Sequence, residues 1–183
     1  MQFKSITLAL FGATGLMAHP FTERDSANPG GFVELDRKPA SDGNGSLVFF
    51  GPGSKGITKR VGTNAVEERG SCQSKQPPVC SAEYTARNEI CDKLVTELFA
   101  DETVGVGEAP RQICYEGEAA ETNEYCCVSW HNVVKNLNKG DLAPIAQEIM
   151  QTCTSEGISG KENNIYVHDT CTSVCLSNRG VGC

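Results

Sequence analysis

The sequence predicts an α+β fold, a small disulfide-stapled α/β sandwich in which two helices pack on one antiparallel sheet. Three observations predict it. All ten cysteines lie between Cys72 and Cys183, two segments carry apolar residues at helical spacing, and three short segments have the composition of strands. A domain of this size builds only one modest core, so cross-links are expected to supply much of its stability.

The cysteine count predicts complete pairing into five disulfides, because an even number of cysteines in a short exported chain forms a disulfide framework. The ten residues are Cys72, Cys80, Cys91, Cys114, Cys126, Cys127, Cys153, Cys171, Cys175 and Cys183. Their spacing leaves the connectivity open. In a strand, the adjacent Cys126 and Cys127 point to opposite faces and should bridge different partners, the alternative being a strained disulfide between the two.

The first predicted helix covers residues 82–100. Its apolar stripe, spaced three and four residues apart, consists of Ile90, Leu94, Val95 and Leu98. The charged residues expected on its other side are Asp92, Lys93 and Glu97. The stripe should face the sheet, because a domain this small needs it as core.

The second predicted helix follows Gly140 and ends at Cys153, with Asp141 as N-cap and Pro144 in its first turn. Its buried face is expected to contain Leu142, Ile145, Ala146, Ile149 and Cys153. The strand signals cover residues 112–115, 125–130 and 165–168. In the last of these His168 alternates with Tyr166, which favours a solvent-facing position for both.

The N-terminal 18 residues have the pattern of a secretory signal peptide, because Lys4 precedes an apolar run over residues 6–17 and cleavage is expected after Ala18. This run is shorter than the roughly 20 residues that a bilayer span needs. No other run of this length occurs in the sequence. The prediction is therefore a secreted, extracellular protein without a transmembrane segment.

Residues 19–60 are rich in Gly and Pro and contain no cysteine, which predicts a disordered propeptide. This segment ends at Lys59 and Arg60, a dibasic pair that resembles the site cut by fungal kexin-like processing proteases. Residues 61–183 then form the mature cysteine-rich domain. The alternative is an ordinary exposed basic pair within a flexible arm.

Charge restricts the partners. The chain has a formal net charge of −7 and no cluster of Lys and Arg. Nucleic acid and anionic membranes attract a basic surface, so neither is an expected partner. The chain is expected to act as a monomer on an extracellular protein or glycan that the sequence does not identify.

Few residues offer chemistry. His131 and His168 are the only histidines after residue 60, and neither accompanies a nucleophile elbow or a metal-ligand pattern. No cofactor or metal is predicted, since export would convert the thiols of a zinc-like Cys171 and Cys175 pair into disulfides. The residues that could contact a ligand are Trp130, His131, Asn178 and Arg179. The planar guanidinium of Arg179 suits a bidentate contact with a carboxylate. A carboxylate of the same chain is the preferred partner, and a carboxylate of a ligand is the hypothesis to test.

The order of motifs resembles the fungal WD-like domain family of small secreted cysteine-rich proteins, over essentially all residues from Cys72 onward. The most specific motifs are Cys126-Cys127-Val128-Ser129-Trp130 and Cys175-Leu176-Ser177-Asn178-Arg179 with the closing Gly182-Cys183. The layout is also similar to fungal necrosis-inducing effector domains and smut killer toxins. No repeat of about 40 residues is present, which excludes a WD-repeat propeller.

The resemblance implies a protein of filamentous ascomycetes, in a family without established enzymatic activity. We therefore expect a non-enzymatic binding protein, effector-like or toxin-like, directed at a host or a competing organism. One alternative is a secreted hydrolase or ribonuclease-like enzyme that uses His131 as base. The other is a structural protein of the fungal surface.

Overall fold

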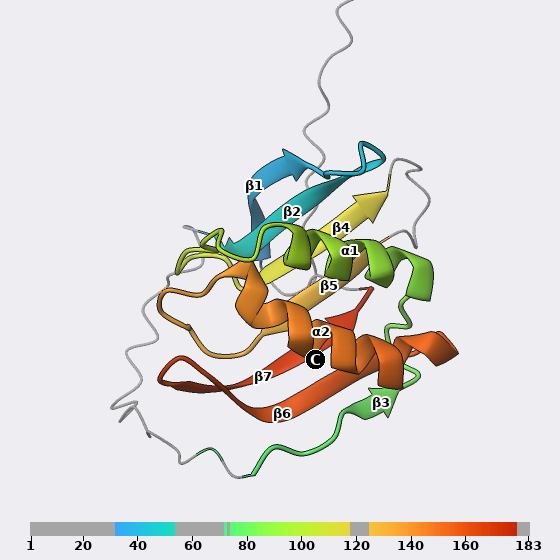
Figure 1. Cartoon of the computed structure of the whole chain (residues 1–183), viewed down its shortest axis with the longest axis vertical. Helices are drawn as coiled ribbons and strands as arrows, with labels where there is room; N and C mark the ends of the chain where they lie inside the picture. The colour runs from blue at the N-terminus through green and yellow to red at the C-terminus, as the bar shows by residue number, and fades with distance from the viewer. Residues whose placement is uncertain (1–31, 54–71, 73, 118–124, 179–183) are drawn as a thin grey trace, which may run out of the picture.

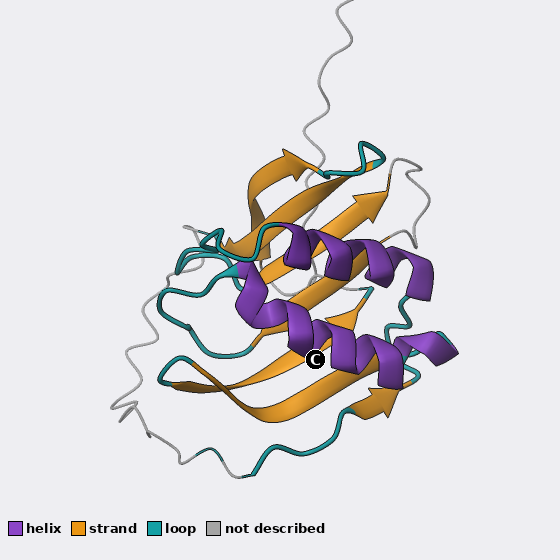
Figure 2. Ribbon diagram, viewed as in Figure 1, coloured by secondary structure: helices purple, strands orange, loops and turns teal. Residues whose placement is uncertain are grey.

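A computed structural model describes residues 32–53, 72, 74–117 and 125–178. The predicted signal peptide, Lys59-Arg60, Arg179 and Cys183 lie outside these ranges. Seven strands form one antiparallel sheet in the order β1-β2-β4-β5-β7-β6-β3, and two helices lie side by side on one of its faces (Figures 1 and 2). The predicted α+β class is confirmed.

The elements follow the chain order. The strands are β1 (Phe32–Pro39), β2 (Gly45–Pro52), β3 (Val79–Ser81), β4 (Gln112–Gly117), β5 (Tyr125–Trp130), β6 (Ser159–Val167) and β7 (Thr170–Ser177). The helices are α1 (Asn88–Ala100), α2 (Lys139–Thr152) and the short 3-10 helix η2 (Thr154–Glu156).

Both predicted helices form, but they begin elsewhere. Tyr84 has a left-handed φ of 57°, which interrupts a helical backbone, and α1 begins only at Asn88. Asn138, not Asp141, is the N-cap of α2. Asp141 is the third helical residue and completes a capping box with Asn138, so Pro144 lies beyond the first turn. No helix in the described ranges is long and apolar enough to cross a bilayer.

The predicted apolar stripes face the sheet. In α1 the stripe residues are all at most 8% exposed, and Leu94 and Leu98 are fully buried. Glu97 was expected on the solvent side, but it is only 4% exposed. Its carboxylate accepts hydrogen bonds from the backbone N–H of Ser41, at 2.7 Å, and from the Ser41 hydroxyl. The turn between β1 and β2 therefore covers this part of α1.

The N-terminal hairpin, residues 32–53 with β1 and β2, corrects the expectation of disorder for this part of residues 19–60. Within β2, Leu47, Val48, Phe49 and Phe50 are all at most 8% exposed. Leu47 and Phe49 join the core under the helices, while Val48 and Phe50 pack with Cys114 and Cys127 on the other face. Burying one such side chain contributes about 1.5–3 kcal/mol, which composition averaged over the segment does not reveal.

Four disulfides are described: two tie the helical layer to the sheet, one joins β4 to β5, and one joins residue 72 to β7. The pairs are Cys72–Cys171, Cys80–Cys153, Cys91–Cys126 and Cys114–Cys127. Cys175 is also disulfide-bonded. Cys126 bridges to α1 on the helix-covered face and Cys127 to β4 on the other, which confirms that these neighbours have different partners.

Candidate functional site

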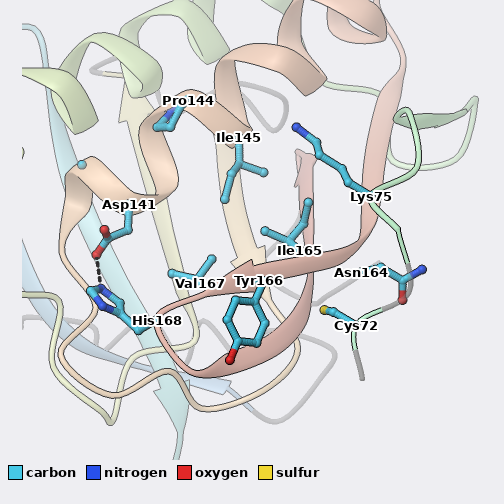
Figure 3. Close-up of a pocket in the computed structure, with 11 residues that line it drawn as sticks. Cys72, Lys75, Asp141, Pro144, Ile145, Asn164, Ile165, Tyr166, Val167 and His168 are labelled. Atoms are coloured by element: carbon cyan, nitrogen blue, oxygen red, sulfur yellow. Dashed lines mark hydrogen bonds and ion pairs between the residues drawn. The ribbon is translucent and has the colours of Figure 1, made fainter. Parts of the chain in front are cut away.

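An open cleft of about 810 Å³ lies between the N-terminal half of α2 and the C-terminal half of β6 (Figure 3). It is lined by Cys72, Lys75, Gly140, Asp141, Pro144, Ile145, Asn164, Ile165, Tyr166, Val167 and His168. A concave site of this size, mostly apolar with a few polar groups, is where a protein is expected to bind a ligand.

The floor of the cleft is apolar because of a bulge in β6. Before the bulge, Glu162 pairs with Val174 and its side chain faces the helices. After the bulge, the side chains of Ile165 and Val167 face the helices. The register shifts between Glu162 and Ile165, where Asn164 takes a left-handed φ of 59°. The bulge thus turns two β-branched side chains toward Ile145 of α2 (Figure 3).

A hydrogen bond between His168 and Asp141 closes one end of the cleft. The Nε2 atom of His168 lies 2.8 Å from Oδ2 of Asp141, and the same oxygen accepts the backbone N–H of Asn138 at 2.8 Å. Asp141 therefore both completes the capping box of α2 and orients the imidazole. The His168 side chain is exposed as expected, at 41%, but the residue lies in the turn after β6 with a φ of 43° and not in a strand. The strand alternation ends before it, which lets the side chain reach α2.

The Lys75 side chain forms the other end of the cleft and contacts two carboxylates. The Lys75 ammonium lies 2.6 Å from a carboxylate oxygen of Glu148 and 2.9 Å from one of Glu162. These two contacts raise the pKa of Lys75. The Glu162 side chain is fully buried, and burial raises its pKa above the ordinary value although Lys75 opposes this. Glu162 is thus a carboxylate kept under α2 at an energetic cost.

Replacing Glu162 with Gln is expected to stabilise the protein at pH 7, because the amide keeps the volume, removes a buried charge whose pKa burial raises, and leaves the half-exposed Lys75 in contact with Glu148. A carboxyl whose pKa is raised on folding binds more protons folded than unfolded, so wild-type stability falls as pH rises from the ordinary carboxyl pKa through the raised one. The advantage of E162Q should therefore vanish below about pH 4. Urea unfolding across this pH range measures it.

The matched control is Glu148→Gln, since Glu148 contacts the same lysine but its side chain is 42% exposed. This variant should change stability by no more than about 0.5 kcal/mol at either pH. A wild type that is more stable than E162Q at pH 7, with the same pH dependence of stability, would contradict the energetic cost assigned to the buried Glu162 carboxylate.

Three of the residues that the sequence offered for binding are described, and none of these three lines the cleft. Trp130 is 5% exposed and packs in the core under the helices. His131 is exposed, its N–H donates to Ser173 O at 3.0 Å and its carbonyl accepts from the Arg111 guanidinium. The Asn178 N–H donates to Tyr84 O at 3.2 Å. Arg179 lies outside the described residues, so its clamp stays a prediction.

Sequence reasoning missed the cleft because its groups are far apart in the chain. Asp141 and His168 are separated by 27 residues and meet only when α2 packs on β6. A local signal existed for Asp141, which lies three residues after Asn138 as a capping box requires. No local pattern connects Lys75 with Glu162. In the described ranges no group of three metal-ligating side chains is found.

Comparison with known proteins adds one match. A family model described as Fungal WD-like matches residues 57–183, well over half of the chain. No curated protein and no solved structure matches it. The matched part begins after the N-terminal hairpin and contains α1, α2 and all the disulfides described above. The chain belongs to the Fungal WD-like family.

Proposed function

We propose that this protein is a secreted, non-enzymatic binding protein that holds an apolar segment of another extracellular protein in the α2–β6 cleft. The disulfides and the family fit a secreted cysteine-rich protein. The observation that carries the proposal is the cleft itself, an apolar floor with a charged group at each end. Apolar contacts supply affinity at such a site, and the polar ends fix orientation.

The floor favours a protein segment over a glycan. A sugar offers hydroxyl groups, which need polar partners, whereas Ile145, Ile165 and Val167 offer none. Tyr166 is the one aromatic residue of the lining, but its ring points away from α2 and is 65% exposed (Figure 3). Recognition without turnover suits an effector-like or toxin-like factor that acts on another organism.

Blocking the cleft tests the proposal. Pro144 is an exposed lining residue, so Pro144→Arg places a long cation over the floor without removing a backbone hydrogen bond. The probe is a library of short random peptides selected on the immobilised full chain. Enriched peptides should carry large apolar residues, and P144R should weaken their binding about tenfold or more, which is roughly 1.4 kcal/mol.

The control is Gln151→Arg, which adds the same charge at an exposed position of α2 outside the cleft. Its peptide affinity should match that of the wild type. Failure to enrich any apolar peptide, or equal affinity of P144R and wild type, would argue against the cleft. Enrichment on a glycan array instead would favour sugar recognition.

A second candidate function is hydrolysis, favoured by the His168 and Asp141 pair. A carboxylate that orients an imidazole is half of the machinery that activates a nucleophile. Among the described residues the lining contains no Ser or Thr, and its Cys72 is disulfide-bonded, so the nucleophile would be water. With fluorogenic peptide and RNA substrates, His168→Ala would abolish turnover and His131→Ala would not. Absence of turnover by the wild type supports binding alone.

A further inference from the structure

The N-terminal hairpin adds two strands to one end of the sheet through a single neighbour. Strand β2 pairs antiparallel with β4 over six residues, from Gly45 opposite Gly117 to Phe50 opposite Gln112. Both faces of β2 are buried, since its alternate side chains enter the two apolar clusters on opposite sides of the sheet. Strand β2 therefore contributes side chains to the apolar cores on both faces of the sheet.

Side-chain contacts also fix the hairpin to β4 and α1. Besides Ser41 with Glu97, the Tyr115 hydroxyl donates to Oδ2 of Asp42 at 2.8 Å. The Arg37 guanidinium lies 2.5 Å from Glu116, and the Arg37 side chain is 42% exposed. Strand β4 and helix α1 thus present acceptors, a donor and an apolar edge that fit this one segment. We call these residues of β4 and α1, together with the backbone of β4 that pairs with β2, the docking edge.

Nothing covalent holds the hairpin except the chain that follows it. The hairpin contains no cysteine, and the disulfides described all lie at Cys72 and beyond. The family match also begins after it, at residue 57. Between the hairpin and Cys72 lies the dibasic Lys59-Arg60, a sequence feature outside the described residues.

We propose that the hairpin is a separable subunit: a processing protease cuts after Arg60, and residues 32–53 stay bound at the docking edge as a non-covalent second chain. Water adds across the peptide bond between Arg60 and Val61, which leaves a carboxylate on Arg60 and an amine on Val61. The cut removes no contact between described residues. The mature protein is then a two-chain complex, not the domain alone.

Retention follows from what release would expose. Without β2, the edge of β4 would present unpaired backbone groups to solvent, beside Ile113 and Tyr115, which are now fully buried. Glu97 would lose both of its hydrogen bonds from Ser41. Strand addition at a sheet edge is a common mode of peptide recognition, in which backbone bonds supply affinity and side-chain pockets supply specificity.

To test this, the secreted full chain is treated with a kexin-type protease. The product is then analysed by size-exclusion chromatography in native buffer and by intact mass measurement without reductant. We expect two masses, one ending at Arg60 and one beginning at Val61, in a single native peak. Denaturant alone should separate them, because no disulfide links them. A chain that resists cutting overturns the proposal, and so does loss of the N-terminal peptide from the native peak.

Variants identify the docking edge as the cause of retention. After cutting, Phe49→Ala should release the peptide in native buffer, because this side chain fills the core under the helices. The control is Val33→Ala on β1, where the side chain is 43% exposed, and its peptide should be retained. Should F49A fail to fold, Arg37→Ala takes its place, since it removes only the exposed contact with Glu116. This variant should shorten the half-life of the two-chain complex. Retention unaffected by either variant would contradict docking through β2.

Discussion

Replacing both Cys91 and Cys126 with Ala is expected to lower the free energy of unfolding by about 4 kcal/mol, a large part of what a domain of this size usually has. The disulfide closes a loop with a sequence separation of 35 and ties α1 to β5. Both sulfurs are fully buried, so the variant also leaves a small cavity in the core. Guanidinium unfolding measures the loss.

A matched comparison separates the effect of cross-linking from that of losing two sulfurs. Cys114 and Cys127 are equally buried but lie opposite each other on neighbouring strands, with a separation of only 13. Because a shorter loop restricts the unfolded chain less, their replacement should cost about 3 kcal/mol. A loss below about 1 kcal/mol for the Cys91 and Cys126 variant would mean that this bridge does not hold the helical layer on the sheet.

Replacing Phe49 with Ala in the uncut chain is expected to cost about 3–5 kcal/mol, the usual range for deleting a buried aromatic side chain. Phe49 is 4% exposed and lies in a cluster with residues of α1, β4 and β5. A disordered propeptide would instead make this substitution neutral. Thermal and urea unfolding of the full chain distinguish the two.

The exposed Val33 of the same hairpin again supplies the control, and Val33→Ala should change stability by less than about 0.5 kcal/mol. Equal stability of F49A, V33A and the wild type would mean that the hairpin is not part of the folded unit.

The helices and the central strands were predictable because their signals are local. The apolar stripe of α1 repeats at three and four residues, and the adjacent Cys126 and Cys127 need only strand alternation to be placed on opposite faces. Their partners, Cys91 and Cys114, were not predictable, because spacing does not determine connectivity. Those pairings depend on how α1 and β4 pack against β5.

The hairpin was missed because composition was averaged over too long a segment. Residues 47–50 are four consecutive apolar residues bounded by turn-forming Gly and Asn, a pattern that also fits a strand buried on both faces. The cleft was missed for a different reason. Its floor depends on a bulge in β6, and its hydrogen bond between His168 and Asp141 depends on the packing of α2 on that strand, neither of which the sequence displays.

Amide hydrogen exchange over residues 46–50 in the native full chain tests most directly whether the N-terminal hairpin completes the sheet. The structure predicts slow exchange there, comparable with that of β5, since β2 is paired on both sides and buried on both faces. Exchange at the rate of an unstructured peptide, while β4 and β5 remain protected, would contradict both the seven-stranded sheet and the two-chain complex proposed from it.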